Sequence, residues 1–195
     1  MPIDWSQGSS DFKRLKLKGF YSDTGKVIFE SFVYPVLTNS VAYDRLTGFF
    51  SVSALVAAAQ GLEGLFRNEG RMRLVIGIHD VPEDLLGALA LGNLLPVQLV
   101  EDYKTRILHE VGFLTDQAKK NALSTVGWMI RSGLLEVRVA APRNSSGIYH
   151  QKRMIFRDGL EQVIVGTGSL NETFGGQGNF EEMQFNFSWL TSHRI

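Results

Sequence analysis

The chain has no cysteine among its 195 residues. Disulfides, thiolate zinc sites and a cysteine nucleophile are therefore excluded, and the absence fits a reducing cytoplasm. The chain also lacks any run of about 18 apolar residues, the length that a membrane-spanning helix needs, and its first residues do not follow the order of a signal peptide. We accordingly expect a cytoplasmic protein with no membrane partner.

Net charge is also absent, because 20 basic residues balance 20 acidic ones. A surface that is basic throughout, as in many nucleic-acid-binding proteins, is therefore excluded, although a local basic patch is compatible with this balance. Basic residues gather at Lys13, Arg14, Lys16 and Lys18. A short charged stretch of this kind is typical of a solvated face.

Apolar patterning predicts helices and strands in alternation. The segment 27–37 suits a helix ending near Pro35, or a strand, and we favour the helix. The other predicted helices span 53–66, 82–91, 97–108 and 116–132, with Gly133 as a stop. Strands are predicted at 43–50, 71–80, 135–142, 149–156, 162–166 and 183–190, and that at 71–80 has the apolar run of a strand buried on both faces. This order predicts one α/β domain over residues 1–195 with a mixed central sheet.

The segment after residue 148 carries the residues with the clearest chemistry. His150 and Lys152 are two apart on a predicted strand, so their side chains point to the same face. A neutral imidazole beside an ammonium group suits attack on phosphorus, because the cation holds the non-bridging oxygens and offsets the charge of the transition state. A phosphodiester or phosphoanhydride fits this pair.

Two further groups follow the next predicted strand. Ser169 and Asn171 lie in a glycine-rich turn that offers hydroxyl, amide and backbone donors to phosphate oxygens. Glu181 begins another strand and can accept a hydrogen bond from the second nitrogen of His150, which would fix the tautomer. Glu182 is the alternative for this acidic position.

These residues together resemble the signature of the phospholipase D superfamily, which is H-x-K, then Asp, then G-S-x-N. The matching positions are His150 and Lys152, Asp158, and Gly168, Ser169 and Asn171, with Glu181 at the acidic position that often follows. The resemblance implies a layered α/β/α sandwich with a mixed sheet, a phosphohistidine intermediate on His150, Lys152 and Asn171 on the phosphate, and no metal or cofactor. The segment 43–77 also resembles the amino-terminal phospholipase D-like domain of bacterial helicases, restriction enzymes and phage-defence proteins.

The chain departs from the signature in two ways. Five residues separate Lys152 from Asp158 where the superfamily has four, so Arg157 stands at the expected aspartate position. The role of Asp158 is therefore the least defined among the candidate site residues, which are His150, Lys152, Asp158, Ser169, Asn171 and Glu181. The superfamily uses two H-x-K motifs in each active site, whereas this chain has one, because neither His79, His109 nor His193 has a Lys two residues later. A homodimer would supply the second copy.

The sequence therefore predicts a metal-independent phosphodiesterase, most simply a DNA nuclease, acting in a homodimeric site. It would be the amino-terminal part of a longer helicase- or restriction-type protein, whose remaining domains act as partners. The alternative is a non-catalytic DNA-binding or dimerisation module of a helicase. A lipid-directed phospholipase fits less well, because the chain shows no amphipathic anchor.

Overall fold

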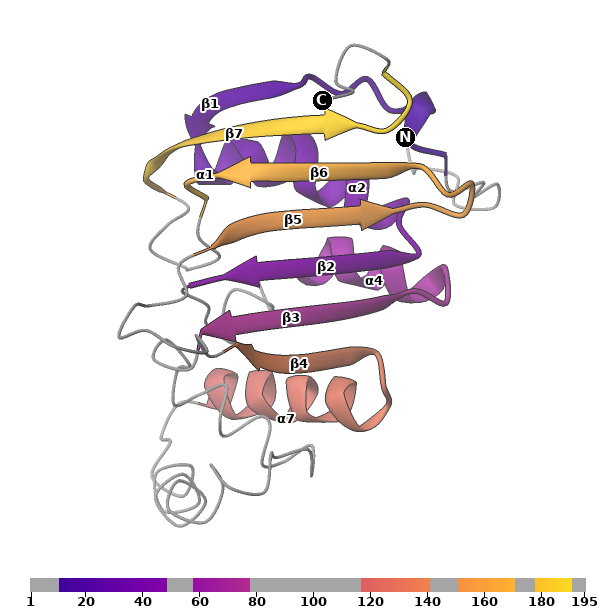
Figure 1. Cartoon of the computed structure of the whole chain (residues 1–195). Helices are drawn as coiled ribbons and strands as arrows, with labels where there is room; N and C mark the ends of the chain where they lie inside the picture. The colour runs from indigo at the N-terminus through magenta and orange to yellow at the C-terminus, as the bar shows by residue number, and fades with distance from the viewer. Residues whose placement is uncertain (1–10, 49–57, 78–116, 141–150, 171–177, 191–195) are drawn as a thin grey trace, which may run out of the picture.

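The computed structural model describes residues 11–48, 58–77, 117–140, 151–170 and 178–190, which form one seven-stranded sheet with helices packed on one face (Figure 1). The strands are β1 (Phe20–Thr24), β2 (Ala42–Thr47), β3 (Arg71–Gly77), β4 (Leu135–Ala140), β5 (Lys152–Arg157), β6 (Val163–Gly168) and β7 (Phe180–Phe187). Their order across the sheet is β1-β7-β6-β5-β2-β3-β4. Strands β2, β3 and β4 are parallel and the other neighbours are antiparallel, which confirms the predicted mixed sheet.

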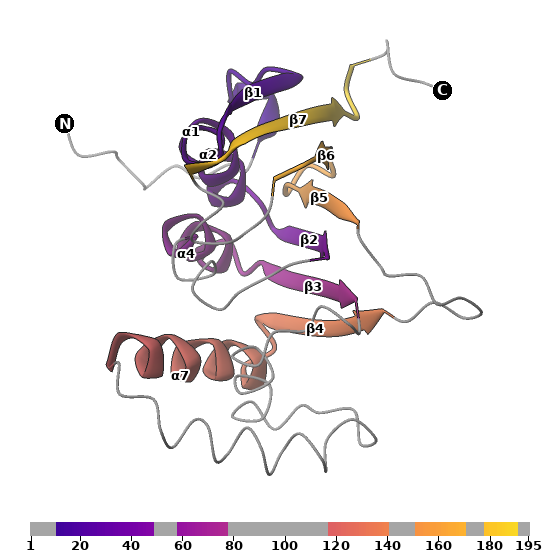
Figure 2. The same cartoon turned by 90° about the vertical axis from the view of Figure 1, so that its left-hand side faces the viewer.

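The described helical elements are the 3-10 turn η1 (Phe12–Arg14), α1 (Gly25–Ile28), the π-helical turn η2 (Phe29–Val33), α2 (Tyr34–Thr38), α4 (Ala59–Arg67) and α7 (Gln117–Arg131). The α-helices among them lie on the same face of the sheet (Figure 2). The helices predicted at 82–91 and 97–108 lie outside the described residues. No helix in the described part of the chain is both long and apolar enough to span a membrane.

The helix predicted over 27–37 is present, but it does not end near Pro35. Elements α1, η2 and α2 follow one another without a break, and Pro35 lies in the first turn of α2. Proline cannot donate to the carbonyl four residues earlier, and its ring would clash with that carbonyl in a regular α-helix. The wider π-helical turn directly before it makes room for the ring, so the helix continues to Thr38.

Aromatic side chains fill the space between the sheet and α1, η2 and α2. Phe32 of η2 stacks on Phe185 of β7 with ring centroids 3.5 Å apart, and Tyr43 of β2 stacks on Phe156 of β5 at 4.7 Å. All four side chains are buried. Tyr43, Phe156 and Phe185 reach this space because alternate residues of each strand face the helices. This packing fixes which side chains of β2, β5 and β7 share a face.

The opposite face of the sheet is more polar than the sequence predicts for β3. Met72, Leu74 and Ile76 are buried on the helix side. The residues that alternate with them, Arg71, Arg73 and Val75, are partly or fully exposed. On this face the carboxylate of Asp44 accepts from Arg73 Nε at 3.0 Å and from Arg157 Nη1 at 2.8 Å. The described helices leave this side of β3 uncovered, so an alternating pattern replaces the expected burial on both faces.

Gly133 ends α7 as the sequence predicts, and its replacement gives a first test of the fold. Its φ of +71° lies in the left-handed region, and the N–H groups of Gly133 and Leu134 donate back to Ile130 and Met129. A Gly133→Ala variant is expected to lose about 1 kcal/mol of unfolding free energy, because an L-residue is strained at this φ. Urea denaturation measures the loss, and an Ala variant as stable as the wild type would contradict the assignment.

Candidate active site

Both halves of the predicted motif come to one end of the sheet, on the left in Figure 1. Lys152 is the first residue of β5, and Gly168 is the last residue of β6. Because β5 and β6 are antiparallel neighbours, the beginning of one lies beside the end of the other. The chain that enters β5 from His150 and the chain that leaves β6 towards Asn171 therefore start from adjacent positions. His150 and Asn171 themselves lie outside the described residues.

Lys152 faces the helix side of the sheet and is half-buried. Its partner across the β2–β5 pair is Thr47, which is fully buried, and the next pair on the same face is Arg45 with Met154. Directly opposite residues of antiparallel strands share a face, so the side chains of Lys152, Thr47 and Arg45 form one row. This row lies where β2 ends and β5 begins.

Gly168 allows β6 and β7 to approach each other closely beside Lys152. The β5–β6 register, continued by one residue, places Gly168 opposite Lys152. A Cβ atom at this position would overlap the carbonyl oxygen of Glu182 and come within 2.6 Å of Met183 Sδ. The first residue of the G-S-x-N turn must therefore be glycine for the strands to pair, which is a backbone reason for that part of the motif.

The two candidate acidic residues are separated by the alternation of β7. Glu181 is 6% exposed and shares the helix-side face with Met183 and Phe185, whereas Glu182 is exposed on the opposite face. The face of Glu181 is also the face of Lys152, at the same end of the sheet. The structure thus places Glu181, and not Glu182, on the face of the sheet that Lys152 shares.

A second carboxylate lies next to Glu181 on the edge strand. Asp23 of β1 is directly opposite Glu181, so both side chains face the helix side. Oδ1 of Asp23 accepts the N–H of Thr24 at 2.7 Å, and the N–H of Gly25 donates to the carbonyl of Asn179 at 2.9 Å. The start of α1 is therefore tied to the residue just before β7, which fixes this edge of the site.

Ser169 continues the pairing of β6 with β7. Its N–H donates to the Glu182 carbonyl, and its hydroxyl oxygen accepts the Glu182 N–H, both at 3.0 Å. The hydroxyl thus takes the place of a backbone carbonyl in the ladder. Ser169 is exposed. Its bonded oxygen has a structural role that the sequence did not predict, while its hydroxyl proton remains able to donate.

The carbonyl of Leu170, between Ser169 and Asn171, is held from β2. Arg45 is 0% exposed, and its Nη2 donates to the Leu170 oxygen at 2.7 Å. The neighbouring Asp44 binds Arg73 and Arg157 on the opposite face of the sheet, so Arg45 and Asp44 point in opposite directions. The signal was available in the sequence, because Arg45 is spaced by two from Tyr43 on an apolar strand.

Asp158 follows the last residue of β5 and so lies at the opposite end of this strand from Lys152. Asp158 is six positions after Lys152, and an extended chain of that length spans about 20 Å. The buried carboxylate accepts three backbone N–H groups, from Phe12 at 2.8 Å, Leu160 at 3.0 Å and Gln162 at 2.9 Å. It closes the β5–β6 turn and is distant from the row of Lys152. Strand β5 pairs in one unbroken register through Arg157, so no bulge within the strand changes the spacing between Lys152 and Asp158.

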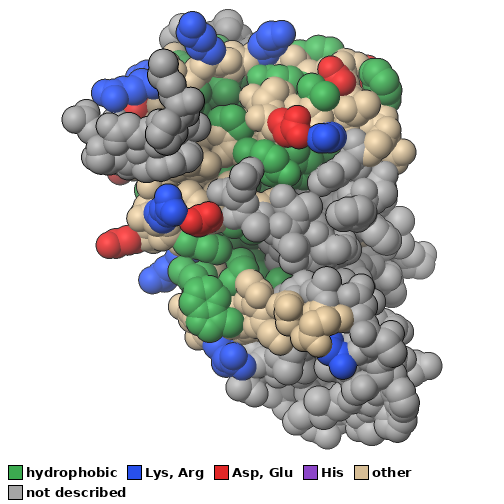
Figure 3. All heavy atoms as spheres, turned by 180° about the vertical axis from the view of Figure 1, so that it is seen from behind, with side chains coloured by type: hydrophobic (Ala, Val, Ile, Leu, Met, Phe, Trp, Pro, Cys, Tyr) green, Lys and Arg blue, Asp and Glu red, His purple; other side chains and the backbone are tan. Residues whose placement is uncertain are grey.

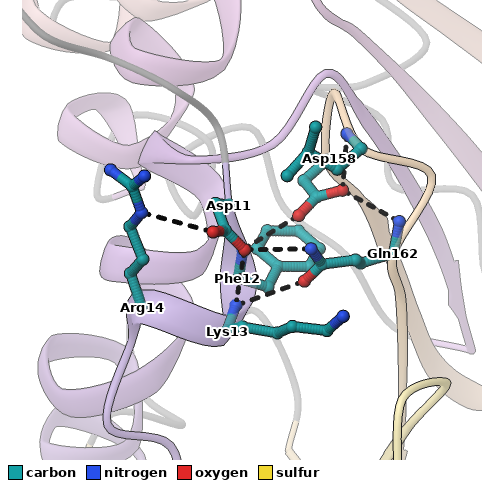
Figure 4. A network of polar contacts seen from close by, with 7 residues as sticks. Asp11, Phe12, Lys13, Arg14, Asp158 and Gln162 are labelled. Carbon is teal, nitrogen blue, oxygen red and sulfur yellow. Dashed lines mark hydrogen bonds and ion pairs between the residues drawn. The ribbon is translucent and has the colours of Figure 1, made fainter.

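Gln162, in the turn that Asp158 closes, binds the segment before β1 as well. Gln162 Nε2 donates to Asp11, and the N–H of Lys13 donates to Gln162 Oε1, so Asp11–Arg14 is bound to the β5–β6 turn (Figure 4). The hydrogen bond from Gln162 and the nearby cations lower the pKa of Asp11 below its ordinary 3.8, against some desolvation. The basic residues Lys13 and Arg14 therefore lie at the far end of the sheet from Lys152.

Within the described ranges, no group of three histidine, aspartate or glutamate side chains is placed to hold a metal ion. Figure 3 shows the helix side of the molecule, where the described Lys and Arg side chains are scattered, some beside acidic ones. The other histidines weighed in the sequence, His79, His109 and His193, lie outside the described residues. Lys152 and Glu181 are thus the two predicted site residues that the structure brings to one face and one end of the sheet.

Comparison with known proteins identifies the fold. No family model matches the chain, and no curated protein matches its sequence. A histidine-to-asparagine mutant of the yeast tyrosyl-DNA phosphodiesterase is similar in structure, with a TM-score of 0.50 and 9% identity over 86% of this chain. A second crystal structure of the yeast enzyme has a TM-score of 0.46 and 9% identity over 80% of this chain.

The chain spans about a third of the length of these structures, with 32% of the first and 27% of the second covered. At this identity the likeness concerns the fold alone. It confirms the predicted α/β architecture as phospholipase D-like.

Proposed function

We propose that the chain is a metal-independent phosphodiesterase of the phospholipase D superfamily that cleaves DNA. The pairing of β5 with β6 carries the proposal, because it brings the beginning of the H-x-K strand and the end of the strand before G-S-x-N to one end of the sheet. The fold shared with a tyrosyl-DNA phosphodiesterase supports a phosphodiester of DNA as the substrate class.

The proposed reaction has two displacements at phosphorus. His150 attacks the phosphorus, a P–N bond forms, and the bond from phosphorus to the leaving oxygen breaks as that oxygen takes a proton. Water then attacks the phosphohistidine, loses its proton to a base, and the P–N bond breaks. Lys152 and Asn171 hold the non-bridging oxygens, and Glu181 orients His150.

A second copy of the chain would complete the site. The reaction needs an acid for the leaving oxygen, and the sequence has one H-x-K motif. A two-fold dimer would place a second His150 across the phosphate, with one copy as nucleophile and the other as acid. The resemblance of 43–77 to helicase- and restriction-associated domains further supports a DNA-translocating or recognition partner for this chain.

The test is cleavage of end-labelled DNA in excess EDTA by the wild-type chain and by His150→Ala. Cleavage that persists in EDTA and is lost in the variant supports the enzyme, and acid-labile label retained on the protein supports the phosphohistidine. Equal traces of cleavage in both preparations would exclude the activity and favour the non-catalytic DNA-binding module. Light scattering tests the dimer, since a monomer with full activity would contradict the two-copy site.

The two adjacent glutamates of β7 give a matched pair of variants. Glu181→Gln is expected to lower kcat about 10- to 100-fold, because an amide orients a histidine less well and stabilises its cation less. The acidic limb of the pH–rate profile should also move to lower pH, since the carboxylate favours protonated His150 and the amide does not. Glu182→Gln removes the same charge from the exposed face and is expected to leave both kcat and the profile unchanged. Equal losses in the two variants would remove Glu181 from the site.

A further inference from the structure

The largest fully buried side chain in the described residues is that of a charged residue, Arg45. A guanidinium is costly to remove from water unless its surroundings hold it, so a fully buried arginine in the middle of a strand calls for a structural or functional reason. Its neighbour Asp44 points to the other face and is bound by Arg73 and Arg157. Arg45 therefore does not serve that ion-pair cluster.

The position of Arg45 relates it to the proposed site. It lies on the helix-side face of β2, one pair further into the sheet than Thr47 and Lys152. Its Nη2 donates to the oxygen of Leu170, in the turn after β6, at 2.7 Å. The hydrogen bond joins residues 125 positions apart in the chain, and it connects β2 to the turn that follows a strand with which β2 does not pair.

The bonded carbonyl belongs to the peptide that leads into Asn171. A peptide group is planar, so holding the Leu170 oxygen restrains the orientation of the peptide group that follows Leu170. The preceding residue is fixed independently, because both the N–H and the hydroxyl of Ser169 bond to Glu182 of β7. The turn is thus held at Ser169 from one neighbouring strand and at Leu170 from β2.

We propose that Arg45 is the positioning residue of the G-S-x-N turn. It aligns the Leu170–Asn171 peptide so that Asn171 meets a phosphate held at Lys152, and it keeps a buried positive charge behind that phosphate. The inference rests on the proposed function for the identity of the substrate. The contact itself, between a buried guanidinium of β2 and the turn after β6, is independent of it.

Arg45→Lys and Arg45→Met separate the two parts of this role. Lysine keeps the charge but lacks the planar fork, and methionine removes both. Arg73→Met is the matched control, because it removes an arginine from the adjacent strand on the opposite face and leaves Asp44 paired with Arg157. The measurements are kcat and KM on a small chromogenic phosphodiester, the affinity for inorganic phosphate, and the backbone amide signals of residues 169–171 in an NMR spectrum.

Arg45→Lys is expected to lower kcat about 10- to 100-fold with KM changed less than about threefold, since a misplaced donor mainly affects the transition state. The amide signals of Leu170 and Asn171 should shift while those of α7 stay in place. Phosphate should bind more weakly to Arg45→Met than to Arg45→Lys, and Arg73→Met should match the wild type in every measurement.

Wild-type kcat and unshifted amide signals in Arg45→Lys would overturn the positioning role, even if Arg45→Met failed to fold. A wild-type chain that cleaves no phosphodiester would refute the proposed function instead. The amide signals and the phosphate titration would then still decide whether Arg45 holds the turn.

Discussion

A Lys152→Met variant is expected to cleave phosphodiesters about 100- to 1,000-fold more slowly than the wild-type chain, the loss typical of removing one preorganised donor from a transition state. Lys152 is half-buried at the first position of β5, on the face it shares with Arg45 and Glu181. Methionine keeps most of the side-chain length and the packing of its apolar stem, so the folded structure should persist. Rates with the chromogenic phosphodiester and the melting temperature together measure the effect.

Arg153→Met provides the control, because Arg153 follows Lys152 directly but is exposed on the other face of β5. It removes one positive charge from nearly the same place in the chain. If the two variants lost activity equally, general attraction of the substrate would explain the loss and Lys152 would not act on the phosphate. Raising the salt concentration adds a second check, since general attraction weakens with ionic strength whereas a local contact does so much less.

Much of the fold could be predicted from local patterns. The apolar run of β3, the alternation of β4 and the glycine after α7 lie where the sequence placed them, whereas β7 begins at Phe180, before the predicted strand 183–190. Strand β1 was missed because Phe20–Thr24 has no alternation of its own, and it exists as an edge strand through its pairing with β7. The sequence predicts a helix end near Pro35 because proline interrupts a regular α-helix. The π-helical turn that accommodates Pro35 could not be predicted from the sequence.

The site was predictable only as far as strand alternation reaches. The spacing of two between His150 and Lys152, and the choice of Glu181 over Glu182, depend on a face that period-two reasoning can assign once the register is known. The buried bond from Arg45 to Leu170 could not be predicted, because it joins β2 to the turn after β6 and depends on the strand order. The placement of Asp158 depends in the same way on contacts with Phe12, 146 residues away.

Asp158→Ala is expected to destabilise the chain by about 3 kcal/mol and to leave the catalytic rate of the folded fraction unchanged. The carboxylate accepts the N–H groups of Phe12, Leu160 and Gln162, and Phe12 and Gln162 are buried. Alanine leaves those two donors without the carboxylate, and each such loss costs about 1–3 kcal/mol. For a chain of this size, the melting temperature should fall by about 6–12 °C.

Asp158→Asn and Glu161→Gln make this prediction specific. Asparagine keeps one oxygen, which can serve the Leu160 and Gln162 N–H groups on Oδ1, so it should lose roughly the one hydrogen bond to Phe12, about 1 kcal/mol. Glu161→Gln removes an exposed carboxylate from the same turn and should leave the stability unchanged. A stable Asp158→Asn variant that had lost catalysis would show that the carboxylate takes part in the reaction. Loss of stability with the rate intact would instead establish that this aspartate holds the β5–β6 turn to the segment before β1, away from the phosphate.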